Sequence, residues 1–208
     1  MIKRILEYLD FLYEDPRCEL NYTKDYELLI AIVLSAQTTD KMVNRVTSVL
    51  FDKYKSLLEL SNANIEDIEN IIREIGTFRK KSIYIISIAL KLVSDGYDYV
   101  PNNREYIESL PGVGRKSANV FLSNIYNEPA IAVDTHVSRV SKRLGLVNET
   151  DDVIIIEEKL QKIIPKDRWT RTHHQMVLFG RYHCKAIKPN CMNCKLKGIC
   201  KYEKDKFL

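Results

Sequence analysis

The sequence predicts an all-α protein. Apolar residues recur every three or four positions through most of the chain, which is the period of a helix with one buried face. Helix-ending residues interrupt these runs, among them Gly76, Gly96, Gly145 and Pro165. No strand pattern, internal repeat or low-complexity linker is convincing, and no shift in composition marks a domain boundary.

The first half of the chain alternates apolar helical runs with capping residues. Thr38 or Thr39 is the expected N-cap of the third helix, and Asn62 or Asn64 that of the fourth. The expected helices cover residues 1–13, 25–37, 39–52, 64–75, 79–94 and 101–110. In the helix over 79–94 the expected buried face consists of Ile83, Ile86, Ala89, Leu90 and Val93.

The second half continues the same pattern. Asp134 stands where an N-cap belongs, and Thr150 or Asp151 is expected to cap the helix after it. Residues 153–156 have the composition of a strand, but residues 157–160 continue a helical period, so we expect a helix there. The expected helices cover residues 115–126, 135–144, 151–164 and roughly 171–181.

The composition excludes several classes of protein. Hydrophobic residues make up 45% and charged residues 29% of the chain, which is ordinary for a globular protein. No run of about 18 uncharged apolar residues occurs, so no membrane span is expected. The N-terminus has acidic residues within its apolar stretch, which predicts a helix rather than a signal peptide, and hence a cytoplasmic protein. A net charge of +4 permits a polyanionic partner.

Residues 110–116 read LPGVGRK and lie between two helical runs. Gly112 and Gly114 flank Val113, the expected buried plug of the turn. Glycines let backbone N–H groups approach a phosphate closely, and the following helix N-terminus adds partial positive charge. With Arg115, these residues are the expected contacts to a DNA backbone, bound without reading bases. The alternative is a plain turn between two helices.

Lys116 follows on the first turn of the second helix of this hairpin. A helix N-terminus disfavours positive charge, and a neutral amine is a nucleophile that can form a Schiff base. The alternative is an ordinary solvated lysine. Asp134 is expected to cap its helix through the N–H of Val137 or His136, which leaves its carboxylate able to face a developing cation. His136 is a candidate DNA contact.

Four of the five cysteines lie within the last 25 residues, with the spacing Cys-x6-Cys-x2-Cys-x5-Cys. In an intracellular chain such a cluster indicates a metal site more than disulfides. Zinc is the competitor, but zinc ribbons usually have two Cys-x2-Cys pairs, and this compact spacing suits a [4Fe-4S] cluster. The expected ligands are Cys184, Cys191, Cys194 and Cys200.

Lysines surround these cysteines. Lys185 and Lys188 lie between two of the expected ligands, where a rigid loop makes them candidate DNA phosphate contacts. The alternative is solvated charge near a C-terminus.

Three motifs together resemble the endonuclease III family of DNA glycosylases. They are residues 110–120 (LPGVGRKSANV), residues 132–136 (AVDTH) and the four cysteines, and residues 34–40 (LSAQTTD) match a further family motif. The resemblance covers nearly the whole chain. It implies a two-lobed helix-hairpin-helix glycosylase fold with a C-terminal [4Fe-4S] cluster loop. One lobe, a helical barrel over residues 21–130, carries the hairpin, and residues 1–20 with 131–208 form the cluster lobe.

The resemblance also implies the chemistry of a bifunctional DNA glycosylase and AP lyase of base excision repair. Members flip a damaged, usually oxidised, pyrimidine out of double-stranded DNA. By analogy Lys116 attacks the sugar C1′, displaces the base and forms an imine, and β-elimination nicks the strand. Asp134 stabilises the cationic sugar, and Gln37 matches the residue that fills the gap left by the flipped nucleotide. The expected enzyme acts as a monomer in the cell.

One position departs from the family pattern. Members often place a bulky apolar wedge directly after the glycine equivalent to Gly76, where this chain has Thr77 followed by Phe78. These two residues are the wedge candidates, and the departure leaves the damage preference open. Branches specific for adenine or for thymine mismatches lack the lysine, so Lys116 favours a glycosylase with lyase activity. The alternatives are a catalytically silent binder of damaged DNA, a glycosylase for another base or mismatch, and a zinc-stabilised DNA-binding module.

Overall fold

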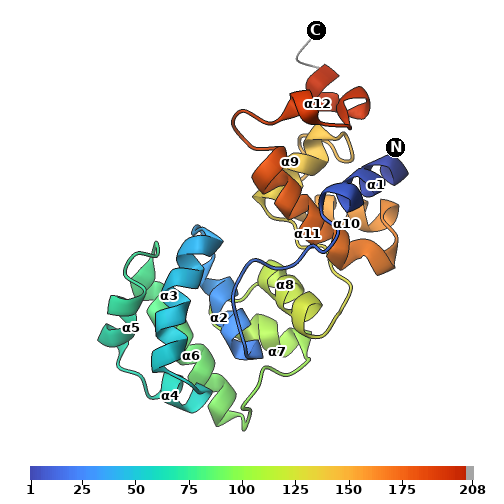
Figure 1. Ribbon diagram of the computed structural model, residues 1–208. Coiled ribbons are helices and arrows are strands. Elements are labelled where there is room, and N and C mark those ends of the chain that lie inside the picture. Colours follow the sequence, from blue (N-terminus) through green and yellow to red (C-terminus); the bar gives the residue numbers. More distant parts are fainter. Residues whose placement is uncertain (205–208) are drawn as a thin grey trace. The chain divides into compact units, whose positions relative to one another are not determined.

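A computed structural model of the chain describes residues 1–204, and residues 205–208, the end of the expected cluster lobe, lie outside the described part (Figure 1). Within residues 1–204 every regular element is a helix, which confirms the all-α prediction. The chain forms two compact units. We call Glu19–Tyr126 the hairpin unit, and residues 1–18 with 127–204 the cysteine unit.

The hairpin unit is built around α2 (Asp25–Leu34), in which every residue from Tyr26 to Leu34 is buried. This helix packs against α3, α6 and α8, so it has no solvent-facing side, and its sequence is apolar nearly throughout. The other helices of the unit are α3 (Asp40–Lys53), α4 (Leu57–Ser61), α5 (Ile65–Ile71), α6 (Phe78–Ser94), α7 (Arg104–Ser109) and α8 (Arg115–Ile125) (Figure 1).

The predicted end of α2 at residue 37 is wrong, because the helix ends at Leu34. The chain then turns through Gln37, whose φ of 57° is left-handed and incompatible with continuing a helix. Thr39, one of the two expected caps, accepts a hydrogen bond from the Met42 N–H at 3.3 Å and begins α3. Asn64 likewise caps α5 through Glu66.

The predicted buried face of α6 is also wrong in part. Ile83 and Leu90 are about half exposed, whereas Ala89 is buried as expected. Because α6 carries apolar residues on most of its circumference, periodicity did not distinguish its faces. The buried residues are Lys81, Ser82, Ile85, Ile88, Ala89 and Leu92.

The cysteine unit joins the first helix of the chain to the last ones. Its helices are α1 (Ile2–Leu12), α9 (Thr135–Arg143), α10 (Val153–Ile163) and α11 (Trp169–Leu178). After α11 the chain continues as a π-helix, η2 (Phe179–His183), so residues 169–183 form one helical stretch that covers the expected helix over 171–181. Short turns η3 (Cys191–Asn193) and η4 (Lys197–Ile199) and helix α12 (Lys201–Lys204) complete the described residues. Residues of the shared core include Ile5, Leu9, Val137, Val140, Leu160 and Phe179.

Asp152 caps α10, which corrects the expectation of Thr150 or Asp151. Its carboxylate accepts the N–H groups of Ile154 and Ile155, both at 2.9 Å. Asp151 instead accepts the Asn148 N–H and pairs with a lysine, so it closes the preceding turn. Residues 153–156 are helical, as the sequence predicts.

No helix among residues 1–204 is both long enough and apolar enough to cross a membrane.

Candidate functional site

The hairpin turn lies between α7 and α8 in the hairpin unit. Val113 is buried, as expected for the plug of the turn, and its N–H donates to the Leu110 carbonyl at 3.1 Å. Gly112 has a left-handed φ of 78°, and a Cβ added there would lie 2.5 Å from Cδ2 of Tyr84. Both the backbone angle and the space therefore require glycine at this position.

Gly114 has a different role. Its backbone is extended, and a Cβ there would meet nothing within 4 Å, so neither strain nor packing requires glycine. It is the N-cap of α8 and supplies no side chain to the first N–H groups of that helix. Arg115 and Lys116 follow on the first turn, and both side chains are exposed. A glycine cap, two cations and a helix N-terminus together suit an anion.

Two residues of the hairpin unit other than glycine also have left-handed backbones. Gln37, with φ of 57°, and Thr77, with φ of 56°, are both exposed. Thr77 is the N-cap of α6, and its hydroxyl donates to the Gly76 carbonyl at 2.6 Å. Phe78 is half-buried and carries the guanidinium of Arg79 over its ring, 5.0 Å from the centroid. A left-handed conformation is uncommon for residues other than glycine, so both loops are strained.

Asp134 belongs to the cysteine unit. Its Oδ1 accepts the Val137 N–H at 2.7 Å, which confirms the predicted cap of α9. His136 is half-buried, and its Nδ1 lies 3.1 Å from Nη2 of Arg139. A Cβ on Gly180 would lie 2.8 Å from the His136 Cβ, so α9 and η2 pack closely at this glycine. Burial lowers the pKa of His136, and the neighbouring Asp134 partly offsets that shift.

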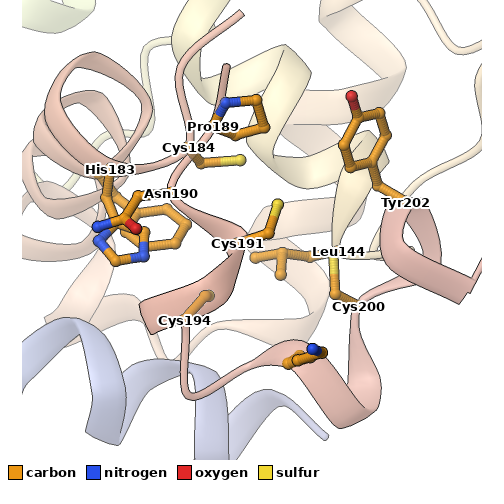
Figure 2. Close-up of a pocket in the computed structure, with 11 residues that line it drawn as sticks. Leu144, His183, Cys184, Pro189, Asn190, Cys191, Cys194, Cys200 and Tyr202 are labelled. Carbon is orange, nitrogen blue, oxygen red and sulfur yellow. The ribbon is translucent and has the colours of Figure 1, made fainter. Parts of the chain in front are cut away.

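The four expected ligand cysteines line one pocket in the cysteine unit (Figure 2). Figure 2 shows them around a common space, with His183 on one side and Tyr202 on the other. All four are free of disulfides and partly buried. Burial, with smaller contributions from the neighbouring thiols, raises the pKa of the Cys194 thiol to about 11.

Arg143, at the end of α9, holds the loop that carries the first of these cysteines. Its Nη1 donates to the Lys185 carbonyl at 2.6 Å and approaches Sγ of Cys184 at 3.5 Å, and its Nη2 donates to the Ala186 carbonyl at 3.1 Å. Its own carbonyl accepts from Sγ of Cys200 at 3.2 Å. One arginine therefore joins α9 to both ends of the cysteine cluster.

Lys185 and Lys188 lie on this loop with exposed side chains. Arg143 holds the backbone of the loop at Lys185, and the Asn190 N–H closes it by donating to the His183 carbonyl at 3.0 Å. Lys188 itself has a left-handed φ of 51°. The loop is thus held in one shape while both ammonium groups face solvent.

The comparisons with known proteins agree with this geometry. The model of the family described as HhH-GPD superfamily base excision DNA repair protein matches residues 30–166. The chain belongs to that superfamily. Endonuclease III of Bacillus subtilis (strain 168) is 42% identical over 200 residues, which cover 96% of this chain and 91% of that protein. This similarity places the chain in the endonuclease III family, as the sequence motifs predict.

Two solved structures have the same fold. A non-covalent endonuclease III–DNA complex has a TM-score of 0.95 and 46% identity, covering 99% of this chain and 96% of that chain. A trapped endonuclease III–DNA covalent intermediate has a TM-score of 0.94 and 45% identity, covering 100% and 97%. The predicted helix-hairpin-helix glycosylase fold is therefore confirmed. As a family member the chain is a base excision repair enzyme, a DNA glycosylase with AP lyase activity.

The endonuclease III family is in general an iron–sulfur family, and the cysteine pocket fits such a group. Four free thiols share one pocket whose remaining lining includes Leu144, Phe179 and Pro189. Among residues 1–204, no three His, Cys, Asp or Glu side chains converge tightly enough to hold a single metal ion. Four partly buried thiols around one pocket are the donor set that an iron–sulfur cluster requires.

Sequence reasoning missed three residues that shape these sites. Tyr84 packs against Gly112, Arg143 holds the cysteine loop, and Lys81 is buried with its ammonium on backbone carbonyls. Only Lys81 had a signal in the sequence. It stands in helical register with the buried Ile85 and Ile88, and a lysine on an apolar face is unusual.

Proposed function

We propose that this enzyme removes oxidised pyrimidines from double-stranded DNA inside the cell, acting as a monomer, and nicks the strand through a Schiff base on Lys116. The observation that carries the proposal is the exposed amine on the first turn of α8, directly after a hairpin whose glycines leave the backbone open. The relative trapped as a covalent intermediate with DNA supports a covalent mechanism.

The hairpin binds the DNA backbone. Gly112 turns the chain over Tyr84, Val113 anchors the turn in the core, and Gly114 begins α8 without a capping side chain. The N–H groups of the first turn and the cation of Arg115 are directed to a phosphate. His136, Lys185 and Lys188 of the cysteine unit are proposed as further DNA contacts, of which the exposed Lys185 and Lys188 have the stronger support.

Lys116 is the nucleophile. Its neutral amine attacks C1′, the bond from C1′ to the base breaks, and the base leaves with a proton. The nitrogen then forms an imine with C1′ as the sugar ring opens. Loss of a proton from C2′ breaks the C3′–O bond, which nicks the strand, and hydrolysis of the imine frees the lysine. Asp134 stabilises the positive charge that develops on the sugar, because its carboxylate stays fixed by the cap to Val137.

Extrusion of a nucleotide leaves a gap in the duplex, and we assign Gln37 to fill it. Its exposed side chain and left-handed backbone are consistent with this role. Of the two wedge candidates, Thr77 is exposed and Phe78 is half-buried under Arg79, which supports Thr77 as the residue that meets the opposite strand. A small polar side chain there is expected to discriminate less between opposite bases than a bulky wedge does.

The cysteine pocket holds a [4Fe-4S] cluster, with Cys184, Cys191, Cys194 and Cys200 as ligands. Bound there, the cluster would join Cys184 and Cys191, which flank the loop of Lys185 and Lys188, to Cys194 and Cys200. Arg143 holds the same loop to α9 through hydrogen bonds. Its role is structural, since the proton and bond changes of the reaction need only the amine and the carboxylate. Iron and acid-labile sulfide in equal amounts, with broad visible absorption, are expected of the purified protein. Stoichiometric zinc without iron contradicts the assignment.

Borohydride trapping tests the function. The protein is incubated with duplexes carrying thymine glycol, an abasic site, uracil or a mismatch, and covalent adducts are resolved by denaturing electrophoresis. Adducts are expected on thymine glycol and the abasic site, with Lys116→Gln giving none. Lys91→Gln, on the exposed surface of α6 beside Asp95, is the matched control and should trap normally. Binding without any adduct or nick favours a silent damage binder, and equal trapping by Lys116→Gln rejects the nucleophile.

A further inference from the structure

Lys81 has an unusual environment for a lysine. It is the fourth residue of α6, and only 4% of its surface is exposed. Its Nζ donates hydrogen bonds to the Leu34 carbonyl at 2.9 Å and to the Ala36 carbonyl at 2.6 Å. Burial lowers the pKa of this amine, which reflects the unfavourable loss of water around the charge. A buried ammonium is rare because that loss must be offset by strong local contacts.

Capping of α2 explains only part of this arrangement. Leu34 is the last residue of that helix, so its carbonyl lacks a partner within the helix, and a cation near a helix C-terminus is favourable. A glycine or an exposed lysine supplies the same stabilisation without burying a charge. The second hydrogen bond is to the Ala36 carbonyl, which lies beyond the end of α2, so capping of that helix does not explain it.

The Ala36 carbonyl belongs to the peptide that joins Ala36 to Gln37. A hydrogen bond to that oxygen fixes the plane of the peptide. The φ angle of Gln37 describes rotation about the next bond, N–Cα, so fixing the plane restricts that angle. Gln37 sits at φ 57° with its side chain exposed. A strained conformation of this kind persists only where the surrounding structure holds it.

The backbone of Lys81 bonds the second strained loop. Its N–H donates to the Thr77 carbonyl at 3.1 Å, and Thr77 has φ 56°. Lys81 therefore bonds the backbone at both left-handed residues of the hairpin unit that are not glycine. Its N–H bonds the Thr77 carbonyl, and its ammonium bonds the Ala36 carbonyl directly before Gln37. A group that is held in its bound shape beforehand loses less freedom on binding.

We propose that Lys81 is a positioning residue that holds the Gln37 and Thr77 loops as one rigid element, so that both enter the duplex together when the lesion nucleotide is extruded. This inference rests on the proposed function, in which Gln37 and Thr77 contact DNA. Lys81 is buried, so its effect passes through the backbone of the two loops.

The test compares two reactions of the full-length protein. Single-turnover base removal from a thymine-glycol duplex requires the gap to be filled, whereas β-elimination on a single-stranded abasic oligonucleotide has no opposite strand and no gap. Lys81→Met keeps the aliphatic stem and removes the ammonium. It is expected to slow duplex excision by about 10²-fold, as a misplaced group does, and to leave single-strand cleavage within about twofold. Lys91→Met, exposed on the same helix, is the control.

A double-mutant cycle with Gln37→Ala sharpens the result. If Lys81 acts through Gln37, Lys81→Met adds little to the loss caused by Gln37→Ala. Hydrogen exchange at residues 35–38 should also become faster in Lys81→Met, because the turn loses the hydrogen bonds from the ammonium to the Leu34 and Ala36 carbonyls. If Lys81→Met does not fold, Lys81→Gln, which keeps a donor, and Lys81→Arg, which keeps the charge, are compared in the same two assays.

Three outcomes overturn the inference. They are duplex excision that is unchanged in the folded variants, a parallel loss of both reactions that follows thermal stability, and full additivity with Gln37→Ala. The proposed function fails differently, because wild-type protein then gives neither excision on the duplex nor cleavage of the abasic strand.

Discussion

Gly112 lies against the ring of Tyr84 so closely that a Cβ would come within 2.5 Å of Cδ2. Its φ of 78° adds a second penalty, since L side chains rarely adopt that angle. We therefore expect Gly112→Ala to reduce the free energy of unfolding by about 1–3 kcal/mol, from combined strain and overpacking. Urea denaturation followed by circular dichroism measures the change.

Gly114→Ala is the matched control in the same turn. Gly114 is extended and a Cβ there meets open space, so this variant has no strain or overpacking and should lose at most about 1 kcal/mol, from replacing glycine by alanine at the N-cap of α8. If the two variants are equally destabilised, the contact with Tyr84 does not explain the glycine at position 112. Equal stability of both variants and wild type leads to the same conclusion.

Asp134 has a cap role and a proposed charge role that substitution can separate. Asparagine is as good an N-cap as aspartate, so Asp134→Asn should change stability by less than about 0.5 kcal/mol, whereas Asp134→Ala should lose about 1 kcal/mol. Both remove the carboxylate that we propose stabilises the cationic sugar. Base excision should therefore fall by roughly 10²- to 10³-fold in both.

Single-turnover excision and urea denaturation on the same preparations give the two numbers. An Asp134→Asn protein that excises at the wild-type rate confines Asp134 to the cap of α9.

Arg143 is expected to protect the cysteine loop. Arg143→Ala removes the donor to the carbonyls of Lys185 and Ala186, which leaves a loop with exposed lysines less rigid. We expect visible absorption from the proposed cluster to decay several-fold faster in air, with weaker DNA binding at a given salt concentration. Lysine cannot reproduce the planar fork of donors, so Arg143→Lys should be intermediate.

Arg17→Ala removes an exposed arginine of the same unit whose ion pair with Asp15 is largely solvated, and it should behave as wild type. Identical decay in all the variants shows that the thiolates alone hold the loop.

His174 predicts sensitivity to acid. Burial lowers its pKa from 6.5 to about 4, so the unfolded chain binds a proton between those values that the folded chain excludes. The contribution of His174 to the free energy of unfolding is thus fully present above pH 6.5. It decreases by about 3 kcal/mol as the pH falls toward 4. Trp169, the one tryptophan of the sequence, lies on α11 with His174 and reports unfolding of the cysteine unit by fluorescence.

His174→Asn should lose most of this pH dependence. The comparison uses the urea midpoints of wild type and His174→Asn at pH 7.5 and 4.5. If the midpoint falls by the same amount between the two pH values in both proteins, other groups cause the acid sensitivity. The hairpin unit contains none of the four histidines of the sequence, so its own stability should change less over this range.

Local chemistry in the sequence predicted the longer helices, three of the four expected caps and the family, but not the short α4. Thr39, Asn64 and Asp134 begin the expected helices because a short polar side chain satisfies orphan N–H groups wherever it stands in the sequence. The motifs around Lys116 and the cysteine spacing identify the family for a similar reason, since each is a run of neighbouring residues. The roles of the individual site residues stay predictions for the experiments above.

Tertiary structure decided which residues are held by distant parts of the chain. The buried face of α6 followed from where α2 and α4 pack, because the helix is apolar on most sides and its own sequence prefers no single face. The partnerships of Tyr84 with Gly112, of Arg143 with Lys185 and of Lys81 with Ala36 join residues far apart in sequence. No local pattern encodes such contacts, because they exist only after the helices have packed.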